Sequence, residues 1–218
     1  MTTPLTIDVI SDVVCPWCFI GKRRLEAALK LYAEKHPDAP APQVTWHPFQ
    51  LNPDLPPEGI SRQDYIAKKF GPGGAQKYER VAAVGESVGI PFAFDKIARQ
   101  PNTLAAHSLI GMAEPGPAQD KVKETLLNAY FIEAADLTDD DVLLDLAERA
   151  GLDRDEAAAQ LADPRAREAV NAADEQARRM GVEGVPFFVF NKRVGLSGAH
   201  EPETLLDAIE QSEATAAA

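Results

Sequence analysis

The stretch Ser11-Asp12-Val13-Val14-Cys15-Pro16-Trp17-Cys18-Phe19-Ile20-Gly21 decides the fold, because it holds both cysteines of the chain. An alternating apolar run over residues 5–10 precedes it and predicts a buried strand. The residues that follow predict a long amphipathic helix. Its expected inner stripe contains Cys18, Leu25, Ala28, Leu29 and Tyr32, and its expected outer face contains Lys22, Arg23, Glu26 and Lys30. Cys15 is therefore expected where the strand meets the helix, with Pro16 in the first helical turn.

This placement predicts different properties for the two thiols. A helix N-terminus offers free N–H groups and a positive dipole end, which stabilise a thiolate, and the thiolate is the form that attacks disulfides. We therefore expect Cys15 to be an acidic, exposed nucleophile. Cys18 lies one turn further, on the inner side of the helix, and is expected to be a buried thiol that resolves a mixed disulfide.

Other uses of a cysteine pair fit the sequence less well. A structural zinc site needs four ligands, but the chain has no second cysteine pair, and its four histidines stand singly at His36, His47, His107 and His200. A structural disulfide or two inert thiols remain as alternatives. A preceding strand and a Pro-Trp spacer favour the redox-active interpretation.

Composition limits the class of protein. The chain has 218 residues, of which 45% are hydrophobic and 26% charged, as in globular proteins. Its net charge of −12 argues against binding to nucleic acid or to an anionic membrane. The first residues show no signal peptide, so we expect a cytoplasmic location, where a cysteine pair is more often catalytic than structural.

The flanking segments predict a sheet interrupted by helices. Residues 43–51 alternate like a second strand, with Val44, Trp46 and Phe49 inward, and a strand-helix-strand order implies a right-handed parallel crossover. After the proline-rich residues 52–59, strands are expected to vanish for about 120 residues in favour of capped helices.

Several of these expected helices carry recognisable start signals. Ser61 with Asp64 resembles a capping box, and Asp163-Pro164 opens the last helix of this region. The acidic residues 139–141 are expected to complement a helix N-terminus rather than to bind a cation.

Strand character returns at residues 184–190. A turn at Asn191-Lys192 then predicts a hairpin, and a final helix opens at Glu201-Pro202. Pro186 stands at the start of a buried strand, although proline has no N–H group to donate to the sheet. A cis Val185-Pro186 bond that turns the backbone towards the cysteines would explain a proline at this position.

With its Cys15-Pro16-Trp17-Cys18 motif and its late Gly184-Val185-Pro186-Phe187-Phe188 segment, the chain resembles thioredoxin-fold oxidoreductases of the DsbA-like superfamily. The longer match over residues 11–22, with Asn102-Thr103 and His107, is similar to the FrnE-type branch. Relatives of that branch include 2-hydroxychromene-2-carboxylate isomerases and kappa-class glutathione transferases. The resemblance implies an α/β thioredoxin fold interrupted by a large all-α insertion. We expect a thioredoxin-like domain at 1–58 and 176–214, an insertion at 59–175 and a frayed tail at 215–218.

The resemblance also implies roles for individual residues. Cys15 would be the nucleophile, Cys18 the resolving thiol and Pro186 the cis-proline that faces them. The predicted substrate-binding residues are Pro16, Trp17 and Val185, the last through its backbone. An exposed apolar groove near Trp17, Phe19 and Pro186 would suit either an oxidoreductase or a binding protein.

Two further residues are weaker candidates. His200 replaces the family's usual glutamine and is interpreted either as a residue that tunes a thiol or as an exposed histidine at a helix start. Asp12 is interpreted either as a buried proton acceptor for Cys18 or as a polar residue that ends the first strand.

Three functions follow from this sequence. The first is a thiol-disulfide oxidoreductase that acts on protein or small-molecule thiols and disulfides and is recycled by an external oxidant or reductant. The second is a glutathione-dependent isomerase or transferase, and the third is a redox-regulated chaperone or binding protein. The dithiol itself is the expected redox group, with no metal or other cofactor and with glutathione as a possible cosubstrate. Because both cysteines are retained, the first function is preferred.

Overall fold

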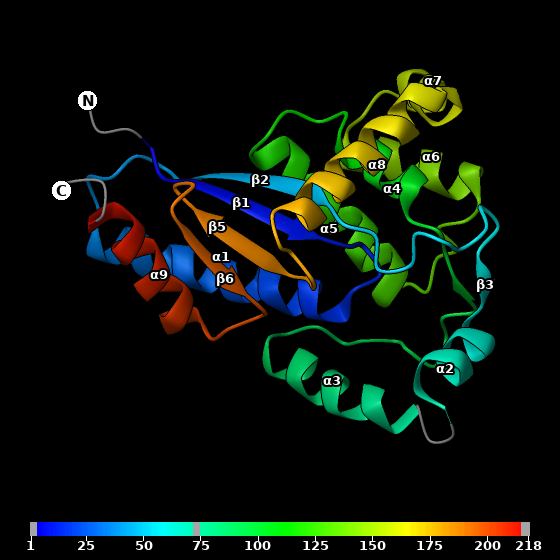
Figure 1. Cartoon of the computed structure of the whole chain (residues 1–218), viewed down its shortest axis with the longest axis horizontal. Helices are drawn as coiled ribbons and strands as arrows, with labels where there is room; N and C mark the ends of the chain where they lie inside the picture. Colours follow the sequence, from blue (N-terminus) through cyan, green and yellow to red (C-terminus); the bar gives the residue numbers. More distant parts are fainter. Residues whose placement is uncertain (1–3, 72–74, 215–218) are drawn as a thin grey trace.

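A four-stranded sheet forms the centre of the computed structural model, which describes residues 4–71 and 75–214. The strands lie in the order β2 (Gln43–Pro48), β1 (Thr6–Ser11), β5 (Phe187–Phe190) and β6 (Val194–Ser197). β1 runs parallel to β2, whereas β5 is antiparallel to both β1 and β6 (Figure 1). The predicted parallel crossover and late hairpin are therefore confirmed.

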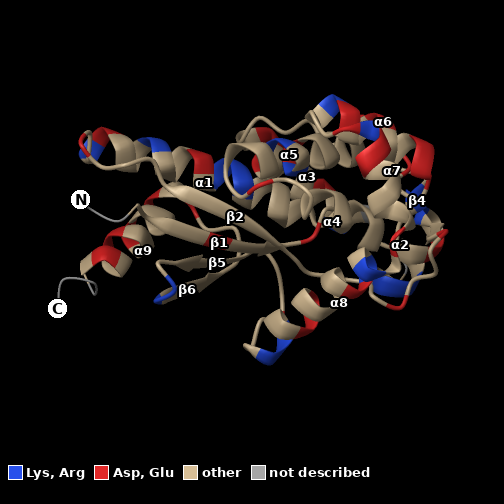
Figure 2. Cartoon of the chain, turned by 90° about the horizontal axis from the view of Figure 1, so that it is seen from above, with Lys and Arg blue, Asp and Glu red and all other residues tan. Residues whose placement is uncertain are grey.

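The two faces of the sheet are covered by different helices. Ile7 and Val9 of β1 share one face and pack in the main core with α1 (Pro16–Lys35) and α9 (Pro202–Ala214). Ile10, on the other face, packs with Phe49 and with Ala177 of α8 (Pro164–Arg179). Figure 2 shows α1 and α8 on opposite sides of the sheet.

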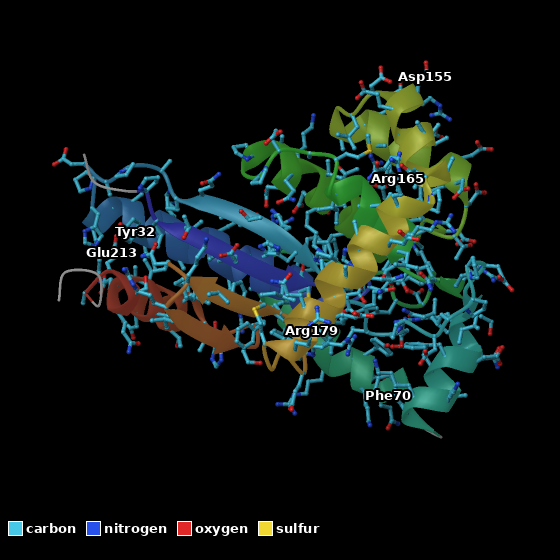
Figure 3. All side chains as sticks on the ribbon, turned by 45° about the horizontal axis from the view of Figure 1, so that its top comes forward. Tyr32, Phe70, Asp155, Arg165, Arg179 and Glu213 are labelled. Carbon is cyan, nitrogen blue, oxygen red and sulfur yellow. The ribbon has the colours of Figure 1, made fainter. Side chains whose placement is uncertain are left out.

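α1 and α9 lie side by side over the sheet. Near the far end of α1, the Tyr32 hydroxyl donates a hydrogen bond of 2.7 Å to Glu213, and Figure 3 shows the two side chains together at this end of the molecule. Burial, followed by this carboxylate, raises the pKa of Tyr32 to about 12. The last turn of α9 is therefore hydrogen-bonded to α1.

The outer face predicted for α1 is wrong at Lys22, which is 2% exposed. Its ammonium group contacts Glu26 of its own helix, and it contacts Asp120 and Glu124 of α5 (Pro117–Phe131) at 3.0 Å each. Arg23 also pairs with Glu124. These carboxylates compensate for the burial of the lysine, so a charged residue lies between two packed helices.

Helices fill most of the segment between β2 and β5. They are α2 (Arg62–Phe70), α3 (Ala75–Ser87), α4 (Leu104–Ile110), α5, α6 (Asp140–Ala150), α7 (Arg154–Ala162) and α8. The expectation that strands vanish here is wrong in one detail, because β3 (Ile60–Ser61) pairs with β4 (Arg99–Gln100). α7 was not predicted from the sequence.

The predicted helix starts are confirmed. Ser61 accepts a hydrogen bond from the Asp64 backbone N–H, and Asp139 accepts one from the Asp141 N–H. The acidic run at 139–141 therefore caps α6, as the helix dipole favours. Asp163 likewise caps α8, which has Pro164 as its first residue.

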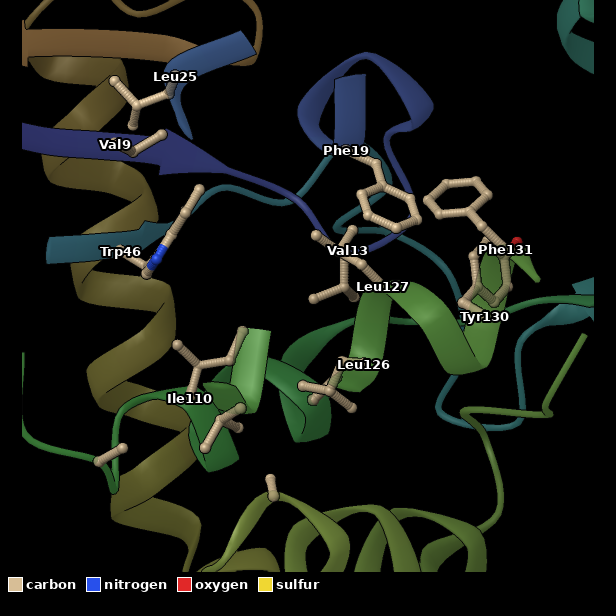
Figure 4. Packing of buried hydrophobic residues seen from close by; sticks show 14 of the residues in the cluster. Val9, Val13, Phe19, Leu25, Trp46, Ile110, Leu126, Leu127, Tyr130 and Phe131 are labelled. Carbon is tan, nitrogen blue, oxygen red and sulfur yellow. The ribbon is translucent and has the colours of Figure 1, made fainter. Parts of the chain in front are cut away.

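One aromatic cluster joins α1 to the helical segment between β2 and β5. Phe19 of α1 lies 6.2 Å from Phe131 of α5 and 6.0 Å from Phe92, measured between ring centroids. Figure 4 shows Phe19 beside Phe131 and Tyr130, with Val13 and Leu127 below. Because Phe19 directly follows Cys18, this packing fixes the first turns of α1 against the helices.

The division into a discontinuous thioredoxin-like domain and a 59–175 insertion stays a prediction. Its second boundary falls inside the continuous helix α8. The predicted tail at 215–218 lies outside the described residues. None of the helices in the described parts of the chain is long and apolar enough to cross a membrane.

Candidate active site

Cys15 lies at the N-cap of α1, four residues after the end of β1, as predicted. Its carbonyl oxygen accepts hydrogen bonds from the backbone N–H groups of Cys18 at 3.0 Å and Phe19 at 3.4 Å. Both cysteines are free thiols. The first turn of α1 therefore carries Cys15 at its start and Cys18 three residues later.

The predicted exposure of Cys15 is wrong, because only 4% of its surface is accessible, compared with 1% for Cys18. The reason lies in a segment far along the chain. The Cys15 Sγ atom is 3.5 Å from the carbonyl oxygen of Val185, to which it donates a hydrogen bond. The segment before β5 therefore covers the thiol at the end of α1.

The Val185-Pro186 peptide bond is cis, as predicted. Pro186 is buried, and its carbonyl oxygen accepts a hydrogen bond of 2.8 Å from the backbone N–H of Gly198. A Cβ atom placed on Gly21 would lie 2.9 Å from Pro186 Cγ and 3.3 Å from Phe188 Cζ. A glycine at position 21 is thus what lets α1 approach the Pro186 segment so closely.

The two thiols have opposite acidities. A hydrogen bond from the Cys18 side chain lowers the pKa of Cys15, and this effect outweighs the burial that raises it. Burial, followed by the interaction with Cys15, raises the pKa of Cys18 well above its ordinary value. The arrangement favours one thiolate, on Cys15, with the proton retained on Cys18.

The side chains between the cysteines differ in accessibility. Trp17 is 38% exposed and Pro16 is partly buried. Phe19 is fully buried in the aromatic cluster, and Pro186 is buried as well. Trp17, Phe19 and Pro186 therefore form no exposed apolar groove, and among these three residues only Trp17 presents an apolar surface to solvent.

Asp12 is completely buried, directly after β1. One carboxylate oxygen lies 3.3 Å from the Nε2 atom of His107, and the other accepts a hydrogen bond of 2.8 Å from the Leu51 backbone N–H. Burial acts to raise the pKa of Asp12, but His107, Leu51 and Lys123 outweigh it and lower the pKa. Asp12 is therefore an ionised residue at the buried end of β1, and its role as a proton acceptor for Cys18 stays a prediction.

Lys123 of α5 was missed in the sequence analysis, although it lies close to this buried group. It is fully buried, and its ammonium group has no hydrogen-bond partner in the described part of the chain. Burial lowers the pKa of Lys123, whereas Cys18 and Asp12 oppose that shift. A signal was present, because Lys123 falls on the helical stripe of Leu127 and Tyr130, where an apolar residue is expected.

His200 lies exposed just before α9, and its Nε2 atom is 2.8 Å from the carbonyl oxygen of Ser197. This position agrees with the interpretation of an exposed histidine at a helix start. A role in tuning a thiol stays a prediction. Within residues 4–71 and 75–214, no group of three or more His, Cys, Asp and Glu side chains could hold a metal ion.

Comparison with known proteins gives one family match and one curated relative. A family described as the DSBA-like thioredoxin domain matches residues 6–210. An uncharacterised protein of Bacillus subtilis (strain 168), YwbO, is 28% identical over 147 residues, which span 67% of this chain and 66% of YwbO.

Three solved structures share the fold over nearly the whole chain. The probable DsbA oxidoreductase SCO1869 of Streptomyces coelicolor is 27% identical, with a TM-score of 0.84, over 96% of this chain and 90% of that one. A 2-hydroxychromene-2-carboxylate isomerase is 15% identical, with a TM-score of 0.72, over 97% and 98%. The cytosolic disulfide reductase DsbM of Pseudomonas aeruginosa, solved with GSH, is 17% identical, with a TM-score of 0.59, over 96% of each chain. These matches confirm the predicted thioredoxin fold with its helical insertion.

Proposed function

The chain belongs to the DSBA-like thioredoxin domain family, and we propose that it is a thiol-disulfide oxidoreductase with Cys15 as nucleophile and Cys18 as resolving thiol. The observation that carries this proposal is the opposite acidity of the two thiols. A nucleophile with a lowered pKa beside a thiol that keeps its proton is the arrangement that two-step disulfide exchange requires.

The reducing direction proceeds by two displacements. The Cys15 thiolate attacks one sulfur of a substrate disulfide, the substrate S–S bond breaks, and the departing sulfur takes up a proton from solvent. Cys18 then loses its proton and attacks the Cys15 sulfur. This step releases the second substrate thiol and leaves the Cys15–Cys18 disulfide. Two electrons pass to the substrate, and the oxidising direction is the reverse sequence.

Val185, Pro186 and Trp17 are the proposed contacts for the substrate. The Val185 carbonyl already lies within 3.5 Å of the Cys15 sulfur, so a chain held by this backbone would lie next to the reactive atom. Trp17, 38% exposed, offers apolar surface beside it. Pro16 lies between them in the first turn of α1.

Glutathione is the proposed external thiol that reduces the Cys15–Cys18 disulfide back to the dithiol. Support comes from the fold shared with DsbM, a cytosolic disulfide reductase whose structure was solved with GSH. If this protein is also cytoplasmic, the glutathione pool there keeps thiols reduced and favours the reducing direction.

The decisive experiment is equilibration of the protein against a series of glutathione redox buffers, followed by alkylation of free thiols and intact-mass measurement. We expect a reversible loss of two hydrogen atoms with a single midpoint, and Cys15→Ser to abolish it. A protein that forms no Cys15–Cys18 disulfide across the series, or that forms only a stable glutathione adduct, contradicts the proposal.

A further inference from the structure

A large cavity lies in the helical segment, between α2, α3 and residues 92–98. Its volume is about 870 Å³, within the range of roughly 300–1,000 Å³ that small-molecule sites occupy. Its wall is mainly apolar and aromatic, with Tyr78, Phe92, Phe94, Ile97 and Ala82 among the lining residues. We call this space the aromatic cavity.

Arg62 is the buried charge of the aromatic cavity. Only 5% of its surface is accessible, and its guanidinium lies over the rings of Tyr65 at 5.3 Å and Tyr78 at 4.8 Å. One terminal nitrogen donates to Gln100 and, at 3.4 Å, to the Tyr130 hydroxyl. Its Nε atom has no hydrogen-bond partner among the residues that the structure describes.

Within the described residues, no carboxylate forms an ion pair with this guanidinium. Among the residues that the structure describes, none of the ion pairs within 4.0 Å involves Arg62, and its hydrogen-bond partners Gln100, Tyr130 and Tyr78 are polar side chains other than carboxylates. The cavity also has Glu79 and Asp95 in its lining, but both are exposed and lie where water screens their charges. A buried, unpaired cation is costly, and a bound anion would remove that cost.

The aromatic cavity also adjoins the helix that carries the dithiol. Phe92, one of its lining residues, packs edge-to-face against Phe19 at 6.0 Å, and Phe19 directly follows Cys18. The wall of the cavity is therefore in contact with the first turn of α1.

We propose that the aromatic cavity binds the body of the substrate, while Val185, Pro186 and Trp17 contact its reacting sulfur end. The substrates that fit are small disulfides and thiols with an aromatic body and an anionic group bound by Arg62. Aromatic rings match the cavity walls, and a carboxylate or sulfonate matches the planar donor array of a guanidinium. This inference rests on the proposed function for its redox part, whereas ligand binding can be measured without any thiol chemistry.

The first test measures ligand binding to the Cys15→Ser/Cys18→Ser double variant by calorimetry. The probe is 1-naphthoate, and the uncharged control compound is 1-naphthalenemethanol. We expect naphthoate to bind more tightly. Arg62→Met should weaken naphthoate binding by roughly 10- to 100-fold and Arg62→Lys less, because the strength of one charge-assisted hydrogen bond is lost or reduced. Equal binding of the two probes overturns the inference.

A second pair of variants removes any dependence on the stability of Arg62 substitutions. Ala82 lines the aromatic cavity, whereas the neighbouring Ala83 is exposed and is not among its lining residues. Ala82→Leu should reduce naphthoate binding at least tenfold by filling the space, and Ala83→Leu should leave it unchanged. Unchanged binding to Ala82→Leu overturns the inference.

The last test connects the cavity to turnover in the protein with both cysteines. Reduction of 5,5′-dithiobis(2-nitrobenzoate), an aromatic carboxylate disulfide, is compared with reduction of 2-hydroxyethyl disulfide. Ala82→Leu should slow the first reaction at least fivefold relative to the second. If both rates fall equally or neither changes, the cavity is not the substrate site. If neither disulfide is reduced but naphthoate still binds, the proposed function fails and the anion site stands.

Discussion

The Nε2 atom of His107 lies 3.3 Å from the Oδ1 atom of Asp12, and both side chains are almost completely removed from solvent. This pair joins the end of β1 to α4 in the helical segment. The pKa of Asp12 is lowered because His107, together with Leu51 and Lys123, overcomes the cost of its burial. The charged end of β1 is therefore stabilised by residues from outside the sheet.

Replacing His107 by alanine leaves the Asp12 carboxylate buried without its histidine. We expect a loss of about 2–4 kcal/mol in the free energy of unfolding at pH 7, measured by urea denaturation. Because the lowered pKa of Asp12 gives stability that is present above its ordinary value of 3.8 and is lost as the pH falls below it, the variant should also lose less stability on acidification. The exposed His36→Ala is the control, and an equal effect there would contradict this interpretation.

The two thiols should react at different pH values. Because the pKa of Cys15 is lowered and that of Cys18 is raised, iodoacetamide near pH 7 should modify Cys15 alone. In Cys18→Ala, the loss of the hydrogen bond to the Cys15 sulfur should move the Cys15 titration to higher pH, as followed by thiolate absorbance at 240 nm. Peptide mapping that finds Cys18 modified first would reverse the assigned roles.

The same titration has a consequence for stability. The folded state lowers the pKa of Cys15 below 9.0, so the reduced protein gains stability as the pH rises through the folded-state value towards 9.0. We expect this gain to be absent in Cys15→Ser. Urea denaturation of both reduced proteins at several pH values measures the difference.

Glu124 is the acidic partner of Lys22 and Arg23 between α1 and α5. Burial acts to raise its pKa, but the hydrogen bond from Arg23 and the charge of Lys22 outweigh it and hold the pKa at about 2. Glu124→Gln should cost about 1–3 kcal/mol at pH 7, and the difference from the parent should shrink between pH 4.5 and pH 2. The exposed Glu175→Gln should change stability by less than about 0.5 kcal/mol.

Gly21→Ala tests the close approach of α1 to Pro186. The added methyl group would lie 2.9 Å from Pro186 Cγ, so we expect a loss of about 1–3 kcal/mol in stability. Displacement of Pro186 should also uncover Cys15 and speed its alkylation at fixed pH. Gly111→Ala, where the nearest atom is 3.4 Å away, is the matched control. Unchanged alkylation of Gly21→Ala would show that Pro186 does not cover the thiol.

Local sequence signals predicted the scaffold of the site well. The N-cap position of Cys15, Pro16 in the first turn and the cis bond before Pro186 all follow from what proline and a helix N-terminus require of their neighbours. The capping of α2 by Ser61 was equally visible, because its hydrogen bond spans only three residues.

Contacts between distant residues could not be predicted in this way. Cys15 is buried because Val185, 170 positions later, covers it. Lys22 was placed on the outer face because Asp120 and Glu124, which compensate for its burial, belong to another helix. The pairing of Asp12 with His107 likewise depends on how the helical segment folds back onto β1.

The hydrogen bond between Tyr32 and Glu213 indicates where the protein can be attached to a solid support. Along the axis of α1, Tyr32 lies roughly 25 Å from Cys15, at a rise of about 1.5 Å per residue. A linker joined to the end of α9 would therefore sit at the opposite end of this helix from the dithiol. An electrode or a bead coupled there leaves the reactive end directed into solution, whereas one coupled near Trp17 obstructs it.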